Sequence, residues 1–362
     1  MSFAMSPALG ELAAGAPGSI PRVAAARELS SLELTVSALR PLLDAPGVTE
    51  LCINRPGGVF VETAAGWCYQ PLPELDFEWC RRFARLVANY TRQRVDESAP
   101  LLSAALPGGE RVQLVLPPAT SADCVAISIR RPARNQWSIR ELAGQGVFSA
   151  APRAASGCDA LEAQLLALLG AGELEAFMQA AVRGRRNILV SGPTGSGKTT
   201  WIRALIREIP PDERLITIED TPELPLDRHP NHVHLFYSKD DQGVARVSPK
   251  QLLEACLRMK PDRILLAELR AEEAFDYLRN VNSGHPGSIT SVHATSAELA
   301  FEQLMLLIKL SPAGRALSRA DIKELLYMLI DVVIQFDTQH RRRFIREVWY
   351  DPQRKRRQGA VS

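Results

Sequence analysis

Residues 192–199 constrain the fold of this chain more than any other segment, because they match the phosphate-binding pattern G-x-x-x-x-G-K-[ST] at every fixed position. The apolar run Asn187–Val190 comes before them and predicts a strand, and residues 200–208 follow with helical spacing. A strand, a glycine-rich loop and a helix in this order predict a nucleotide site in an α/β fold. The predicted nucleotide-binding residues are Gly192, Pro193, Thr194, Gly195, Ser196, Gly197, Lys198, Thr199 and Thr200.

Each residue type in this loop has a chemical purpose. Glycines let the backbone curl until successive N–H groups point at phosphate oxygens, and the following helix adds the positive end of its dipole. Lys198 places a positive charge between the β- and γ-phosphates, and the Thr199 hydroxyl is a ligand for Mg²⁺. The sequence therefore predicts an ATP site with Mg²⁺ as cofactor and Lys198 among its catalytic groups.

Strands and helices alternate after the loop. Strands are expected at 215–219, 263–267 and 288–292, and helices at 249–259, 271–282 and 296–309. Two further helices, at about 159–170 and 172–183, are expected before the loop. Such alternation predicts a largely parallel sheet with helices packed on its faces.

The N-terminal half is smaller, mixed and rich in strands. Helical spacing appears at 32–43 and 77–91, a glycine turn joins strands at 48–54 and 59–62 into a hairpin, and further strands are expected at 110–116 and 125–129. Residues 149–157 are small and have no periodicity, which predicts an interdomain linker. We therefore expect a flexible arm over 1–30, an α+β domain over 31–148 and an ATPase domain over 158–362.

Two carboxylates stand at the ends of predicted strands in the ATPase domain. Glu219 ends the strand at 215–219, and Glu268 directly follows the strand at 263–267. Ligands in an open parallel sheet bind at the carboxyl ends of the strands, so both acids are expected beside the phosphates. A solvated acid at a strand end has the same local pattern. Ala267 stands where an apolar strand of this kind commonly ends in Asp.

His285 and His293 flank the predicted strand at 288–292. A histidine at such a tip can donate a hydrogen bond to a γ-phosphate and respond to its loss. A structural histidine with a hydrogen-bond partner is the alternative. His229, His232 and His234 lie close together, but they have no cysteine partner nearby, so the sequence disfavours a metal site there.

The order of these motifs resembles the secretion (traffic) ATPase superfamily. The phosphate loop is its Walker A motif, Glu219–Asp220 its Asp box, the segment around Glu268 a degenerate Walker B motif, and residues 284–294 its His box. In the N-terminal half, segments 48–57, 109–113 and 127–132 are similar to the N-terminal domain of the ring ATPase of type IV secretion systems. The resemblance covers roughly residues 35–350.

The resemblance implies a fold and a set of roles. The fold is α/β, with a C-terminal RecA-like P-loop NTPase domain and a smaller N-terminal α+β sheet domain. Glu219 corresponds to the acid that activates the attacking water, and Glu268 to the acid on the metal side. The two histidines fall in the γ-phosphate-sensing box. Arg111 and Arg130 match N-terminal-domain arginines that close over the nucleotide phosphates.

The same resemblance implies an assembly and a task. Its members form homohexameric rings on the cytoplasmic face of the inner membrane, where they contact other inner-membrane and cytoplasmic secretion components. They hydrolyse ATP to drive pilus assembly and the export of protein or protein–DNA substrates. Ala267 and Pro286 are small departures from the family pattern.

Three other functions share parts of this pattern. A type II secretion or pilus-retraction motor often carries a four-cysteine module, but after Cys158 this chain has only Cys256. A nucleotide-dependent binding module without hydrolysis would not need two acids. A nucleic-acid translocase would interleave aromatic residues with its basic groups, which this chain does not do, so nucleic acid is not expected as a direct ligand.

The charge balance hides an asymmetry. The chain has 43 Lys and Arg against 41 Asp and Glu, yet residues 339–362 hold eight basic and two acidic side chains. This tail therefore carries +6 and the rest of the chain −4. A basic tail suits an anionic membrane or an acidic partner, or it is simply solvated. The N-terminal arm lacks the pattern of a secretory signal, so we expect a cytoplasmic protein with peripheral membrane contact.

Overall fold

The N-terminal part of the computed structural model is one antiparallel sheet of six strands, in the order β3-β2-β1-β6-β5-β4. The structure describes residues 30–132, 137–148, 159–238, 243–340 and 342–359, so the predicted linker and all but the last residue of the predicted arm lie outside it. The strands are β1 Glu50–Ile53, β2 Gly58–Thr63, β3 Gly66–Pro71, β4 Leu101–Ala105, β5 Arg111–Val115 and β6 Ala126–Arg130. The predicted hairpin is confirmed by the pairing of β1 with β2.

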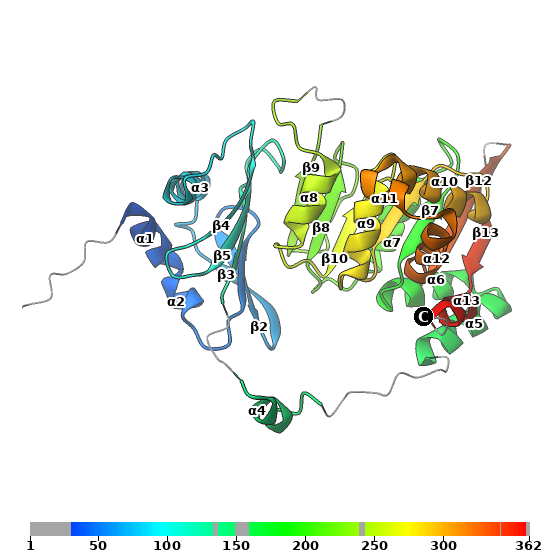
Figure 1. Ribbon diagram of the computed structural model, residues 1–362, viewed down its shortest axis with the longest axis horizontal. Coiled ribbons are helices and arrows are strands. Elements are labelled where there is room, and N and C mark those ends of the chain that lie inside the picture. Colours follow the sequence, from blue (N-terminus) through cyan, green and yellow to red (C-terminus); the bar gives the residue numbers. More distant parts are fainter. Residues whose placement is uncertain (1–29, 133–136, 149–158, 239–242, 341, 360–362) are drawn as a thin grey trace, which may run out of the picture.

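Three short helical segments and one long helix cover one face of this sheet (Figure 1). They are α1 Ser31–Val36, η1 Ser37–Leu39, α2 Arg40–Leu43 and α3 Phe77–Thr91. The helix predicted over 32–43 is broken in this way, and Pro41, which has no N–H to donate, lies in the first turn of α2. A further helix, α4 Ile139–Gly144, lies apart from both domains in Figure 1.

The C-terminal domain has two hydrogen-bonded sheets, β10-β8-β9 and β11-β7-β12-β13, in which all pairs except β12–β13 are parallel. The strands are β7 Ile188–Ser191, β8 Leu215–Glu219, β9 His232–Phe236, β10 Arg263–Leu266, β11 Ile289–Val292, β12 Val332–Gln339 and β13 Arg342–Tyr350. Serine hydroxyls join the two sheets, because Ser288 Oγ donates to Ile264 O at 2.5 Å and Ser291 Oγ to Ala267 O at 2.8 Å. The strands thus form one continuous layer.

Helices cover both faces of this layer, and each face has its own apolar core. One core contains residues of α8 Pro249–Cys256, α9 Glu273–Asn282, α10 Ala297–Leu310 and α12 Arg319–Leu329. The other contains residues of α5 Ala160–Ala171, α6 Leu174–Arg183 and α7 Lys198–Arg207. The short helices α11 Pro312–Ala316 and α13 Pro352–Gly359 complete the domain. The predicted α/β fold, a RecA-like domain with a smaller sheet domain, is confirmed.

The two domains meet along the β9 and β8 side of the C-terminal domain (Figure 1). The guanidinium of Arg214 is buried there; it donates to Asn54 Oδ1 at 2.7 Å and also to the side chain of Asn231. At the edge of this contact, Lys260 Nζ lies 2.8 Å from Glu62 Oε1. Apolar residues of β5 and β6 also belong to the larger apolar core of the C-terminal domain, so the interface combines buried hydrogen bonds with apolar contacts.

Glu50 on β1 makes this interface sensitive to pH. Burial raises its pKa from 4.5 to about 7, against the attraction of Arg130 and Arg214. The folded protein thus keeps this proton where the unfolded chain has lost it, so this group's contribution to stability falls as pH rises from about 4.5 to 7. We expect Glu50→Gln to gain stability relative to the wild type over that range, by at most about 3 kcal/mol. Urea unfolding at pH 5 and pH 8 measures this gain, and a difference that does not change with pH would exclude it.

The C-terminal basic segment is partly held against the ATPase domain. Lys355 Nζ lies 2.7 Å from Asp331 Oδ1, and the guanidinium of Arg354 lies 3.7 Å from the centre of the Tyr327 ring. Asp331 also accepts the backbone N–H of Asn187, directly before β7. These two basic groups are therefore engaged within the chain. Among the described residues, no helix has the length and apolar character needed to cross a membrane.

Candidate active site

The phosphate loop connects the end of β7 to α7, which begins at Lys198 itself. Gly195 and Gly197 have φ angles of +78° and +95°, which side-chain-bearing residues rarely adopt. A Cβ on Gly192 would lie 2.6 Å from the hydroxyl of Ser196 and 3.0 Å from the carbonyl oxygen of Phe336. Positive φ angles at two positions and close packing against Ser196 and Phe336 at the third therefore explain the three glycines of the motif.

Lys198 is held in place before any ligand arrives. Its ammonium donates to the carbonyl oxygens of Gly192 at 2.8 Å and Pro193 at 3.1 Å, and it lies 3.2 Å from His293 Nδ1. Burial lowers the pKa of Lys198, and the nearby Glu268 carboxylate opposes this effect. A buried cation between backbone carbonyls is suited to meet an anion that brings compensating charge.

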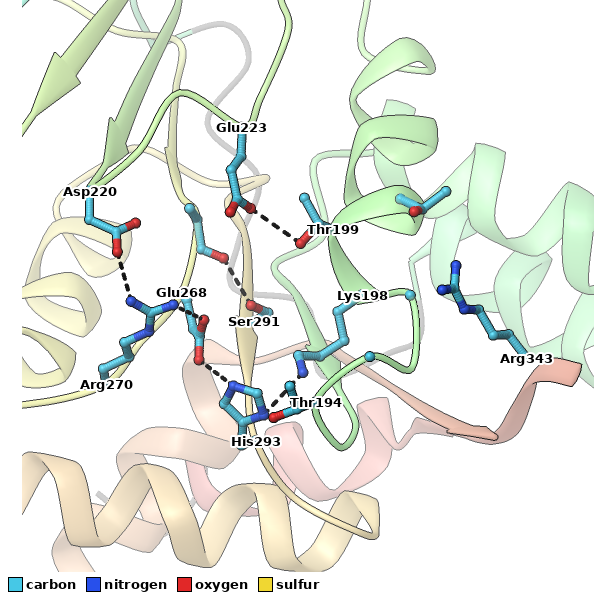
Figure 2. Close-up of a pocket in the computed structure, with 14 residues that line it drawn as sticks. Thr194, Lys198, Thr199, Asp220, Glu223, Glu268, Arg270, Ser291, His293 and Arg343 are labelled. Carbon is cyan, nitrogen blue, oxygen red and sulfur yellow. Dashed lines mark hydrogen bonds and ion pairs between the residues drawn. The ribbon is translucent and has the colours of Figure 1, made fainter. Parts of the chain in front are cut away.

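A cavity of about 330 Å³ opens in front of this ammonium, at the carboxyl ends of the strands (Figure 2). Its lining comes from the phosphate loop, from the segments after β8 and β10, from β11 and from β13. The lining residues are Thr194, Gly195, Gly197, Lys198, Thr199, Thr200, Asp220, Glu223, Ala267, Glu268, Arg270, Ser291, His293 and Arg343.

Acidic and basic side chains alternate along one wall of the cavity (Figure 2). Arg270 donates to Asp220 Oδ2 and to Glu268 Oε2, both at 2.7 Å, and these bonds raise its pKa. The other oxygen of Glu268 lies 2.6 Å from His293 Nε2. His293 in turn contacts Lys198, so a connected chain of polar contacts runs along this wall to the phosphate loop.

Glu223 lies next to Thr199, whose hydroxyl donates to Glu223 Oε2 at 3.3 Å (Figure 2). It lies on the loop after β8, directly after Pro222. Thr199 is the residue type that binds Mg²⁺ in phosphate-loop sites, so Glu223 would lie beside a metal ion held there. The sequence analysis missed Glu223, although it is only four residues from Glu219.

Glu219, predicted to activate water, does not line the cavity. Its side chain is fully buried and accepts four hydrogen bonds. Burial alone would raise its pKa, but donors from His234, Thr217 and the backbone N–H groups of residues 223 and 224 outweigh this, and the pKa is lowered. A carboxylate with this many donors has no lone pair turned to a substrate water, so this geometry does not support the prediction that Glu219 activates water.

Three other predicted residues also lie away from the cavity. His285 precedes β11 and its Nδ1 lies 3.0 Å from Pro261 O, which precedes β10. Both positions are at the amino ends of these strands, whereas the cavity lies at the carboxyl ends. Arg111 and Arg130 face each other on β5 and β6 of the N-terminal sheet, exposed to solvent. The structure therefore brings His293 to the site, but not His285 or the two arginines.

Arg343 is the most distant contributor in sequence. It projects from β13 toward the phosphate loop, and a Cβ on Gly197 would lie 2.9 Å from its Cδ. In Figure 2 it lies across the loop from Glu268 and His293. Nothing local in the sequence marks this residue, because only the pairing of β7 with β12 and of β12 with β13 brings it here.

Comparison with known proteins gives consistent matches over most of the chain. A family profile described as "Type II/IV secretion system protein" matches residues 37–335. The type IV secretion system protein VirB11 of Brucella suis is 46% identical over 342 residues, which cover 93% of this chain and 95% of that protein. The PtlH homolog of Bordetella bronchiseptica is 40% identical over 325 residues, covering 89% and 95%.

One solved structure is similar in sequence and in shape. It is the crystal structure of the VirB11 ATPase from the Brucella suis type IV secretion system in complex with sulphate. Its TM-score is 0.87 at 46% identity, and the match covers 91% of this chain and 97% of that one. Both domains described above therefore have counterparts in a known arrangement.

Proposed function

The chain belongs to the type II/IV secretion system protein family and is an ATPase of the type IV branch, and on this premise we propose that it works as a homohexamer that hydrolyses ATP to drive type IV secretion. The family resemblance and the ATPase activity predicted from the sequence are confirmed. The proposed work is pilus assembly and the export of protein or protein–DNA substrates. The observation that carries the proposal is the cavity in which a phosphate loop, a preset Lys198 and several carboxylates converge.

In the proposed reaction the phosphate loop binds the β- and γ-phosphates. Backbone N–H groups and the N-terminus of α7 supply partial positive charge, and Lys198 supplies a full one. Arg343 lies across the loop from the acidic wall, so we assign it to the α-phosphate and ribose side of the nucleotide. Arg270 and His293 lie at the other end, where charge develops on the γ-phosphate.

Glu223 is the proposed general base. A base must lie within hydrogen-bond reach of the water it deprotonates, or act through one further water. Glu223 lines the cavity beside Thr199, whereas the lone pairs of Glu219 are occupied. Glu268 holds Arg270 and His293 in position, which makes it essential without making it the base.

The donor set fits Mg²⁺. The Thr199 hydroxyl and the Glu268 carboxylate offer hard oxygen ligands around one cavity, and the Glu223 carboxylate beside Thr199 stays free to accept from a water. Among the described residues, no group of three or more His, Cys, Asp or Glu side chains is placed to hold a metal, which suits an ion that takes its remaining ligands from water and phosphate. When bound, Mg²⁺ would neutralise charge on the phosphate oxygens. The protein residues themselves orient the water and receive its proton.

The proposed hexamer explains why two arginines of the N-terminal sheet are exposed to solvent. Arg111 and Arg130 are adjacent, solvent-facing and absent from the cavity of their own chain. We propose that they reach the nucleotide of a neighbouring subunit, which would complete each site across a subunit boundary. Arginine is suited to this work because its planar guanidinium stays charged and binds phosphate with two parallel hydrogen bonds.

We also propose peripheral attachment to the cytoplasmic face of the inner membrane, with other secretion components as partners. Arg343 lines the cavity, and Arg346, Arg354 and Lys355 have partners within the chain, so the remaining basic residues of the C-terminal tail are the candidate membrane contacts. We further propose that residues 31–148 form one domain and residues 158–362 the other. A type II or retraction motor, or a non-hydrolysing binding module, has less support, since the relatives at 40–46% identity carry type IV names and the acidic wall is complete.

The proposal is tested by complementation and by mass measurement. In a strain deleted for its own copy, the wild-type chain is expected to restore export and a Glu223→Gln chain is not, although both are made at equal levels. Light scattering with Mg²⁺ and ATP is expected to give the mass of six subunits. Export restored equally by both chains, or only monomer at every concentration, would refute the proposed motor.

A further inference from the structure

The N-terminal domain touches the ATPase domain at the edge strand β9, next to the loop after β8 that carries Glu223. The backbone N–H of Phe236 on β9 donates to Ala119 O at 2.9 Å, and Thr120 forms an isolated bridge with Leu235. The Thr120 hydroxyl donates to His234 O at 2.8 Å. A loop of one domain therefore extends the edge of the other domain's sheet and fixes the backbone at His234.

The side chain of His234 connects this contact to Glu219 and Thr217 of β8. Its Nδ1 lies 3.1 Å from Glu219 Oε1 and 2.9 Å from Thr217 Oγ1. Thr217 gives its only hydroxyl hydrogen to Glu219 Oε1, at 2.5 Å, so it has none left for the ring. A carboxylate has no hydrogen to give either. The hydrogen between them therefore belongs to Nδ1, and His234 is a donor to Glu219.

Glu219 in turn fixes the backbone of the loop that carries Glu223. Its other oxygen accepts the backbone N–H of Glu223 at 2.7 Å and of Leu224 at 2.9 Å. The side chain of Glu223 then meets Thr199 in the nucleotide cavity. A cavity of about 760 Å³ lies beside this path, and Thr120, His234 and Glu223 are among the residues that line it.

We propose that His234 and Glu219 are positioning residues that make the placement of Glu223 depend on docking of the N-terminal domain. The inference rests on the proposed role of Glu223 as base. When the N-terminal loop holds β9, His234 orients Glu219, and Glu219 fixes the backbone that carries Glu223. Withdrawal of the loop releases that support. Because misplacing a reacting group by about 1 Å can cost roughly 100-fold in rate, such a release is enough to silence hydrolysis.

The test compares two changes at His234 in the full-length protein. His234→Leu removes the donor, and we expect kcat for ATP hydrolysis to fall about 10- to 100-fold while the dissociation constant for ADP stays within about twofold. His234→Asn keeps an N–H near the position of Nδ1, and we expect kcat within about threefold of the wild type. His340→Asn, at an exposed histidine between β12 and β13 and outside this path, is the control and should leave both constants unchanged.

Thr120→Val tests the interdomain half of the proposal without touching the ATPase core. It removes the hydroxyl donor while keeping the shape of the side chain, and we expect kcat to fall several-fold. The same change in a His234→Leu background should have no further effect, because the path is already broken.

Each outcome has a defined consequence. Full kcat in His234→Leu, or equal loss in His234→Asn and His234→Leu, would overturn the positioning role, and independent effects of Thr120→Val and His234→Leu would overturn the link between domains. These failures leave the ATPase assignment intact, because the wild-type protein still turns over ATP. A wild-type protein that binds but does not hydrolyse ATP would instead overturn the assignment of Glu223, and this inference with it.

Discussion

Replacing Lys198 by alanine is expected to reduce ATP turnover at least 100-fold. The ammonium is buried against the Gly192 and Pro193 carbonyls and is the one basic group at the centre of the phosphate loop. Alanine leaves the loop glycines in place but removes the charge that the β- and γ-phosphates need. Steady-state hydrolysis assays measure the loss, and nucleotide-dependent thermal shifts are expected to shrink with it.

The matched control is Lys250→Ala, at an exposed lysine in the first turn of α8. It should hydrolyse ATP as the wild type does. Turnover by Lys198→Ala close to that of this control would mean that hydrolysis occurs somewhere other than the cavity beside α7.

Replacing Glu223 by glutamine is expected to lower kcat by about 100-fold or more, while ATP still binds. The amide keeps the size of the side chain and can still accept from Thr199, but it cannot take a proton from water. The dissociation constant for ATP, measured with Mg²⁺ by calorimetry, should therefore stay within a few-fold of the wild-type value.

Glu219→Gln provides the contrast. Its remaining carbonyl oxygen can still accept the N–H groups of Glu223 and Leu224, but its amide cannot accept from His234, so we expect kcat to fall by no more than the roughly 10- to 100-fold expected of His234→Leu. If the order is reversed, with Glu219→Gln inactive and Glu223→Gln active, the original sequence-based assignment is right and the structural reassignment is wrong.

The local chemistry of the phosphate loop could be predicted from sequence because its demands are local. The glycines satisfy backbone conformations, and Lys198 and Thr199 lie at fixed offsets from them. The alternation of strands and helices could also be predicted from the sequence, since a parallel sheet that helices cover on both faces requires it. These patterns were enough for the fold and for one half of the site.

The other half depends on side-chain direction and on distant pairing. Glu219 does end a strand, as predicted, but its side chain turns to His234 and the loop backbone instead of the cavity. His285 and His293 flank the same strand, and only the strand's direction separates the one at the site from the one at the opposite end. Arg343 reaches the loop through a strand that the sequence analysis did not predict.

The domain contact was the least predictable feature. The docking of the loop at Thr120 on β9 joins positions more than a hundred residues apart, and β9 itself was not predicted as an element. A hydrogen-bonded path of this kind leaves no periodic pattern in the sequence, because its residues lie on separate strands and loops.

The most direct test of the central claim is the structure of the assembled protein with Mg²⁺ and a non-hydrolysable ATP analogue. We expect a water in line with the γ-phosphate and within hydrogen-bond reach of Glu223, directly or through one further water, while Glu219 remains bonded to Thr217, His234 and the loop backbone. A water bound to Glu219, with Glu223 turned away from the nucleotide, would contradict that claim.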